Sequence, residues 1–148
     1  MEDIGVSALA RVHDVFTRAG LDLTEQSESS LKLSSPTAHY ICDFANPDVF
    51  QIKGVWRRTV ALEDRGSLVH FAARCNRERV VPKAYVLPAA AGRAVTLGAE
   101  VNAVTTHGLS RDQFYGFVDS AVVAIATFFA DADKDLPLAP VSMGVVRN

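Results

Sequence analysis

Apolar residues recur along the chain with two different spacings, which predict helices and strands in turn. Spacings of three and four predict helices at residues 7–19, at 68–76 and from Ser110 onward. Alternation of apolar and polar positions, or β-branched and aromatic composition, predicts extended segments at residues 31–34, 39–44, 49–60, 84–87 and 95–104. The predicted order is therefore α-β-β-β-α-β-β-α. We expect an α+β fold in which an antiparallel sheet packs against helices.

The longest predicted elements indicate where the core lies. The strand at 95–104 alternates clearly, so its odd-numbered residues should face the interior. In the strand at 49–60 one side carries Phe50, Ile52, Gly54 and Trp56. The final helix opens on Ser110-Arg111-Asp112-Gln113, which has the spacing of a capping box. Its apolar stripe should pack on the sheet and consists of Phe114, Phe117, Val118, Ala121, Val122, Ile125, Phe128 and Phe129.

A polar segment, residues 75–86, joins the second helix to the strand that follows it, and we call it the joint. Asp64 is placed to cap the start of that helix. Asn76 is expected to end it, because asparagine tolerates the left-handed dihedrals common at helix C-termini. Pro82 disfavours helical geometry at Val81, so a strand should begin at about Lys83.

Composition and charge narrow the class of protein. With 148 residues, 49% of them hydrophobic and 22% charged, the chain fits one soluble domain, which we place at residues 1–137, followed by a C-terminal tail at 138–148. A net charge of −2 argues against a nucleic-acid partner and against binding to an anionic membrane. No uninterrupted apolar run is long enough to cross a bilayer, and the acidic start, Glu2-Asp3, is unlike a secretory signal. We therefore expect a cytoplasmic protein.

Residue types that carry chemistry are present but scattered. Cys42 and Cys75 are too few for a disulfide scaffold and are expected to be small buried hydrophobes. The histidines fall on separate elements without metal-ligand spacing: His13, His39, His70 and His107. No nucleophile elbow and no Gly-rich phosphate loop occurs in the sequence. We therefore expect no catalytic residues, no metal and no cofactor; an enzyme site assembled across a dimer interface is the weakest hypothesis.

Basic residues in and near the joint are the candidates for binding. They are Arg57, Arg58, Arg74, Arg77, Arg79 and Lys83, and if they converge they suit a carboxylate or phosphate on a partner. Alternatively, Arg77, Glu78 and Arg79 form structural ion pairs that fix the angle between helix and strand. Trp56 is either an interface anchor or a core residue at the sheet edge. The candidate partner-binding residues are thus Trp56, Arg57, Arg77, Arg79, Lys83 and Tyr85.

The joint also carries a resemblance to a known family. The segment Asn76-Arg77-Glu78-Arg79, then two residues, then Pro82-Lys83-Ala84-Tyr85-Val86, with a hairpin and a long helix after it, resembles the YbjN-domain family of bacterial sensory transduction regulators. A looser likeness extends from residue 41 to 137, including residues 51–58 and Phe128-Phe129. Cys75 and Val81 stand where family members often have aromatic residues. The resemblance implies a fold similar to type III secretion chaperones, and it implies no catalytic residues.

Two hypotheses for function follow from these observations. The first is a non-enzymatic protein-binding module, regulatory or chaperone-like and homodimeric, whose protein partner is unknown. It would bind extended peptide segments on an exposed face or edge of the sheet. The alternative is a small-molecule or anion sensor that uses the arginine-rich joint from Arg74 to Lys83.

Overall fold

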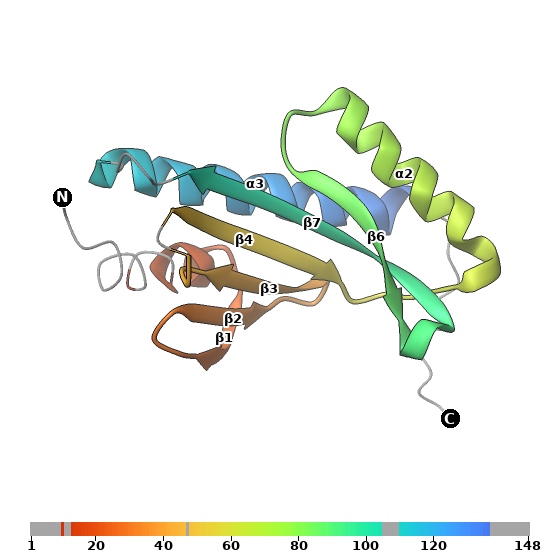
Figure 1. Cartoon of the computed structure of the whole chain (residues 1–148), viewed down its shortest axis with the longest axis horizontal. Coiled ribbons are helices and arrows are strands. Elements are labelled where there is room, and N and C mark those ends of the chain that lie inside the picture. The colour runs from red at the N-terminus through yellow and green to blue at the C-terminus, as the bar shows by residue number, and fades with distance from the viewer. Residues whose placement is uncertain (1–9, 11–12, 47, 105–109, 137–148) are drawn as a thin grey trace.

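A seven-stranded antiparallel sheet with helices on one side forms the protein, as seen in a computed structural model that describes residues 10, 13–46, 48–104 and 110–136. The strands are β1 (Asp22–Gln26), β2 (Ser30–Ser34), β3 (Ala38–Asp43), β4 (Val49–Trp56), β5 (Val60–Ala61), β6 (Lys83–Ala89) and β7 (Ala94–Val104). The helices are a short one at residues 13–18, α2 (Arg65–Glu78) and α3 (Arg111–Asp135), with 3₁₀ turns at Leu62–Asp64 and Ala90–Gly92 (Figure 1).

The predicted α+β class and the predicted order of elements are confirmed, and two short strands are added. β1 escaped prediction because every one of its residues is exposed, so it carries no alternating pattern. β5 arises because the run predicted at 49–60 breaks after Trp56. There the Thr96 hydroxyl donates hydrogen bonds to the carbonyl oxygens of Trp56 and Arg58, at 3.1 and 2.7 Å, and holds the crossing segment against β7.

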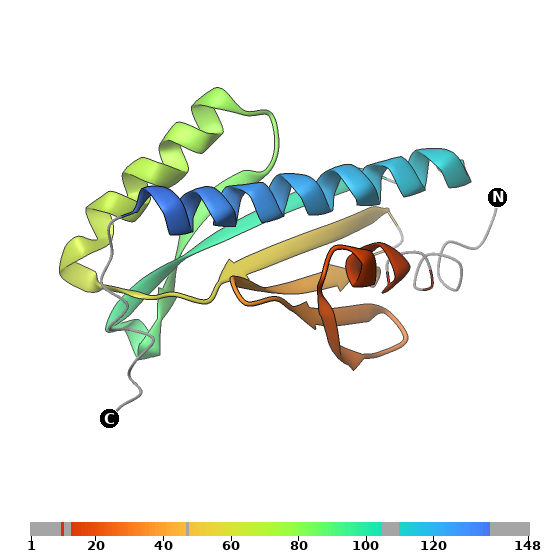
Figure 2. The ribbon, with the colours of Figure 1, turned by 180° about the vertical axis from the view of Figure 1, so that it is seen from behind.

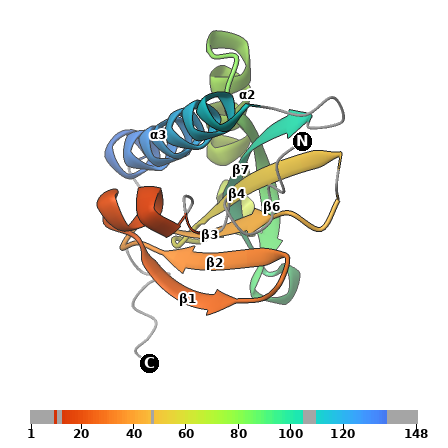
Figure 3. The same ribbon diagram turned by 90° about the vertical axis from the view of Figure 1, so that its left-hand side faces the viewer.

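β7 is the longest strand and organises the sheet. The order is β1-β2-β3-β4-β7, with β6 on the other side of β7 and β5 beside its first residues. α3 runs across one face, and the short helix at 13–18 lies on that same side over the β1 end (Figure 2). Viewed from the end, the sheet bends around these helices (Figure 3). We call the helix side the covered face and the opposite side, over which no described helix lies, the open face.

The covered face forms the core, and the predicted alternation is confirmed there. Its buried strand residues include Leu31, Leu33, Tyr40, Cys42, Phe50, Ile52, Trp56, Leu97, Ala99 and Val101. α3 approaches β4 so closely at Gly54 that a Cβ atom there would lie 2.7 Å from Cε2 of Phe129. A side chain at position 54 would therefore displace the helix from the sheet.

The stripe predicted on α3 is buried against this sheet, apart from the partly buried Phe117. The predicted capping box is confirmed: the Gln113 amide donates to Ser110 Oγ at 3.0 Å, and the Ser110 amide donates to Gln113 Oε1 at 2.9 Å. Residues Asp112–Asp135 have the length and composition of a membrane-spanning helix. Their apolar side chains instead pack on the sheet, as those of a core helix do.

Two element boundaries and one helix cap differ from the prediction. α2 continues to Glu78 and does not end at Asn76, whose side chain bonds to β6 instead of closing the helix. Asp64 occupies the N-cap position of α2, but its side chain makes no capping hydrogen bond. β6 runs through Pro88 to Ala89, where an edge strand tolerates the missing N–H. The turn therefore narrows to Ala90, Ala91 and Gly92, all with positive φ. Residues 105–109, which follow β7, and the predicted tail at 138–148 lie outside the described residues.

Candidate functional site

Asn76 fastens the joint at its base. Its side-chain Nδ2 donates to the Ala84 carbonyl oxygen, and the Ala84 amide donates to Asn76 Oδ1, both at 2.9 Å. The side-chain amide thus supplies one donor and one acceptor to the outer edge of β6, as a neighbouring strand would. Because Pro88 also lacks an N–H on this strand, the outer edge of β6 offers little room for an added strand. Binding of an extended peptide to the edge of the sheet, which the sequence suggested, is therefore unfavourable at β6.

Arg79 of the joint and Arg74, just before the joint, pair with acidic residues at the end of α3. Arg79 Nη2 lies 2.6 Å from Asp131 Oδ2, and Arg74 Nη2 lies 3.6 Å from Asp135 Oδ2. Carboxylates at a helix C-terminus oppose the helix dipole, and these cations offset that cost. The hydrogen bond to Asp131 raises the pKa of Arg79, although burial opposes it. Structural ion pairing is thus observed, with α3 in place of the predicted partner Glu78.

A cleft of about 220 Å³ lies between α2 and α3. Two rings line it, Phe71 and Phe128, with their centroids 5.3 Å apart. Its charged lining residues are Arg74, Glu78, Arg79, Lys134, Asp131 and Asp135. Cys75 also lines it; burial raises the pKa of this thiol. Since two of the three cations are paired with carboxylates, the cleft presents little free positive charge to an anion.

Trp56 belongs to the core. Its side chain is only 2% exposed, and Nε1 donates to Asp133 Oδ1 at 2.8 Å. Of the two roles left open by the sequence, the core position is the one observed. Arg57 lies apart from the joint, and its Nη1 donates to the Ser35 carbonyl at 3.2 Å. Both cysteines, Cys42 and Cys75, are buried, which confirms the prediction for them.

Tyr85 and Lys83 lie on the open face. The Tyr85 ring covers Gly98, the residue opposite it on β7, where it occupies the space of a side chain. Its hydroxyl donates to Glu100 Oε1 at 3.0 Å, and burial together with this bond raises the pKa of Tyr85. Burial of Glu100 acts to raise its pKa. Hydrogen bonds from Asn102 and Tyr85, with the charges of Lys83 and Lys53, outweigh that effect and lower it.

The exposed part of the joint is Val80 and Val81, which we call the tip. Val80 is 98% exposed and Val81 is 44% exposed. On one side of the tip Arg79 is anchored to Asp131, and on the other Pro82 is buried after a cis Val81-Pro82 bond. The sequence signal for this site is a pair of consecutive β-branched apolar residues inside a polar segment, and the pattern of charge does not reveal it.

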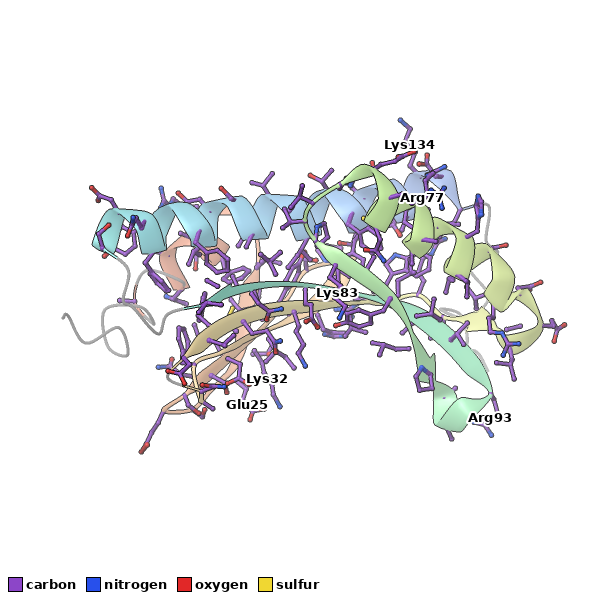
Figure 4. All side chains as sticks on the ribbon, turned by 45° about the horizontal axis from the view of Figure 1, so that its top comes forward. Glu25, Lys32, Arg77, Lys83, Arg93 and Lys134 are labelled. Atoms are coloured by element: carbon purple, nitrogen blue, oxygen red, sulfur yellow. The ribbon has the colours of Figure 1, made fainter. Side chains whose placement is uncertain are left out.

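Two exposed cations flank the tip. Arg77 is on the last turn of α2 and makes no ion pair within the described part of the chain. Lys83 begins β6 and is also exposed. Figure 4 shows Arg77 at the end of α2 and Lys83 on the strand below it. Of the six predicted residues, Arg77, Arg79 and Lys83 therefore lie beside the tip, whereas Trp56, Arg57 and Tyr85 lie elsewhere.

Comparison with known proteins shows which family the chain is related to. The model of the YbjN family, described as "Putative bacterial sensory transduction regulator", matches residues 8–134. The chain belongs to the YbjN family. A solved structure described as "Crystal structure of YbjN, a putative transcription regulator from E. coli" superposes with a TM-score of 0.65 at 14% identity, covering 85% of this chain and 91% of that one.

The resemblance identified from Asn76 to Val86 is thus confirmed at the level of the family. At 14% identity, the YbjN structure supports the fold alone. No curated protein matches the chain by sequence.

Proposed function

We propose that this YbjN-family protein is a non-enzymatic, cytoplasmic regulatory module that binds a protein partner through the tip. The observation that carries the proposal is the pair of exposed valines held between two fixed points of the joint. The side chain of Val80 is 98% exposed, so it contributes almost no buried apolar area to the fold and its surface is available for a partner.

The energetics of such a contact are favourable for a small site. Fully burying one exposed valine side chain contributes roughly 1.5–3 kcal/mol. Val80 is 98% exposed and offers nearly all of this, and Val81, at 44%, offers less than half. Because Asn76 and Arg79 already hold the joint, little conformational entropy is lost when a partner binds. A shallow apolar pocket with an acidic rim is the partner surface that matches the two valines and the cations Arg77 and Lys83.

A capture experiment tests the proposal. The wild-type protein and the double variant Val80→Ser/Val81→Ser would be immobilised, exposed to bacterial lysate and compared by quantitative mass spectrometry. Val69→Ser is the matched control, because Val69 is 49% exposed on α2 and lies away from the tip. We expect a set of proteins that is lost from the tip variant and retained by the control. Equal capture by all three proteins would refute the tip as the binding surface.

The anion sensor remains the second candidate, because the cleft between α2 and α3 is lined by three cations. The anion sensor is the weaker candidate, because two of these cations, Arg79 and Arg74, are already paired with Asp131 and Asp135. A ligand that binds only the folded state raises the melting temperature. Thermal shifts with inorganic phosphate, polyphosphate and nucleotides therefore test it, with Arg74→Ala as the variant that should abolish any shift.

A further inference from the structure

The open face carries charge in a definite order. One row of side chains crosses the open face from β1 to β6, and neighbours in the row are cross-strand partners. In the strand order β1, β2, β3, β4, β7, β6 the residues of this row are Glu25, Lys32, Ile41, Lys53, Glu100 and Lys83. Glu25 and Lys32 lie 3.5 Å apart, and Figure 4 shows both with Lys83 on this side of the sheet. In the middle of the row Ile41, flanked by two lysines, is 37% exposed.

This order of charges is self-complementary. A two-fold axis parallel to the strands and passing between β3 and β4 reverses the order of strands while keeping each row opposite its own copy. The row then faces itself with Lys32 against Glu100 of the partner subunit and Ile41 against the aliphatic stem of Lys53 of the partner subunit. The charges that lie directly opposite each other along the reversed row, Lys32 with Glu100 of the partner subunit and Glu25 with Lys83 of the partner subunit, have opposite signs, whereas the two copies of Lys53 are neighbours across the axis.

The two neighbouring rows match under the same operation. In one, Asp43 and Gln51 are register partners, so Asp43 meets Gln51 of the partner subunit. In the other, His39 and Val55 are partners, so the two exchange places across the axis. The contact therefore has Ile41 and Val55 beside the axis among the polar residues His39, Asp43, Gln51 and Lys53, so it is a largely polar interface.

We propose that two copies of the chain associate through their open faces about this axis. This association is a property beyond the proposed regulatory function. It does not depend on the tip, which lies between α2 and β6. It gives the predicted homodimer a surface. Association through the strand edges is less suitable, because Asn76 and Pro88 occupy the outer edge of β6 and a bulge interrupts β1 between Leu23 and Glu25.

The expected dimer is weak. The sheet bends around its helices and β1 curls back beneath the helix at 13–18, so only the central strands can meet (Figure 3). Four strands at their usual spacing and three rows of side chains cover roughly 400 Å² on each copy. A standard stable complex buries about 800 Å² on each partner. The association should therefore depend on protein concentration and weaken with added salt.

Two substitutions at one position test the register. Ile41→Lys places a cation against Lys53 of the partner subunit on both sides of the axis, whereas Ile41→Glu places an anion there. Sedimentation would be measured from about 10 µM to about 1 mM protein, where weak complexes become populated. We expect Ile41→Lys to weaken association roughly tenfold or more and Ile41→Glu to preserve or strengthen it.

Controls keep the test decisive. Val69→Lys and Val69→Glu make the same changes at an exposed valine of α2 and should leave association unchanged. If Ile41→Lys lowers the melting temperature, Lys32→Glu replaces it, because that exposed side chain faces Glu100 of the partner subunit. A wild-type protein that stays monomeric throughout overturns the proposal. So does equal weakening by Ile41→Lys and Ile41→Glu, which would mean that charge register plays no part. Neither result bears on capture by the tip.

Discussion

The joint contains two neighbouring sets of residues with opposite roles. At its base, Asn76 and Arg79 are engaged with β6 and α3, and each makes hydrogen bonds that hold the chain in place. At its tip, Val80 and Val81 contribute apolar surface that the fold leaves uncovered. A polar, charge-rich segment therefore need not bind through its charges. Here Arg79 is bound to α3, and the apolar residues that follow it are exposed.

The same contrast holds among the arginines. Arg74 and Arg79 pair with carboxylates of α3, whereas Arg77 makes no ion pair among the described residues. Position around the helix explains this, since at about 100° per residue Arg77 lies about 120° around α2 from Phe71, which packs on Phe128 of α3, whereas Arg74 lies about 60° from it. Arg77 is therefore the arginine of the joint that remains available to a partner.

The largest expected effect belongs to the packing beneath the base. Phe128 of α3 is fully buried and contacts Phe71 of α2, so these two rings hold the helices together. Phe128→Ala should lower the free energy of unfolding by about 3–5 kcal/mol. Urea denaturation monitored by circular dichroism measures it. A loss below about 1 kcal/mol would mean that the ion pairs, not the rings, join these helices.

Asn76→Ala should have the next largest effect. It leaves the amide and carbonyl of the buried Ala84 without partners, which costs about 1–3 kcal/mol. The same urea titration applies, with Arg77→Ala as the control on the adjacent exposed residue. We expect the control to stay within about 0.5 kcal/mol of wild type. Equal losses in both variants would show that Asn76 has no special role at the base.

Arg79→Ala should have a smaller effect, because both side chains of its ion pair are more than one-third exposed. Solvent screening limits such a pair to about 1 kcal/mol or less. The loss should shrink further at high salt, which screens the charges. Stability measured at low and high sodium chloride tests this, and a loss independent of salt would contradict an electrostatic role.

The smallest expected effect concerns pH and the open face. Folding lowers the pKa of Glu100 below its ordinary value of 4.5, so its contribution to stability is present above that value and is lost as pH falls through the lowered pKa. Tyr85→Phe removes one of the hydrogen bonds responsible. The variant should therefore differ from wild type near neutral pH and approach it at acid pH. A difference that stays constant across this range would argue against a role for Glu100.

The sequence allowed much of the fold to be predicted, because burial leaves periodic patterns. The stripe on α3, the capping box at Ser110 and the inward positions of β4 and β7 all follow from spacing. β1 could not be predicted, since a fully exposed edge strand has no buried side to generate alternation. The end of α2 was misplaced because Asn76 resembles a helix cap, and its bond to Ala84 depends on a strand eight residues away.

The candidate site was less accessible to sequence analysis. Spacing along the chain identified the basic residues of the joint, but not which of them meet Asp131 and Asp135 on a helix more than 50 residues later. Trp56 was ambiguous for the same reason, because its hydrogen-bond acceptor is Asp133. The exposure of Val80 is a tertiary property, and hydrophobicity alone predicts burial for it.

Site-specific photocrosslinking in bacterial cells tests the central claim most directly. A photoreactive phenylalanine analogue would replace Val80 in one protein and Arg93, at the distant hairpin turn, in another (Figure 4). The account predicts discrete adducts with another protein from position 80 and none from position 93. Identical adducts from both positions, or none from position 80, would contradict the claim that the tip is where this protein meets its partner.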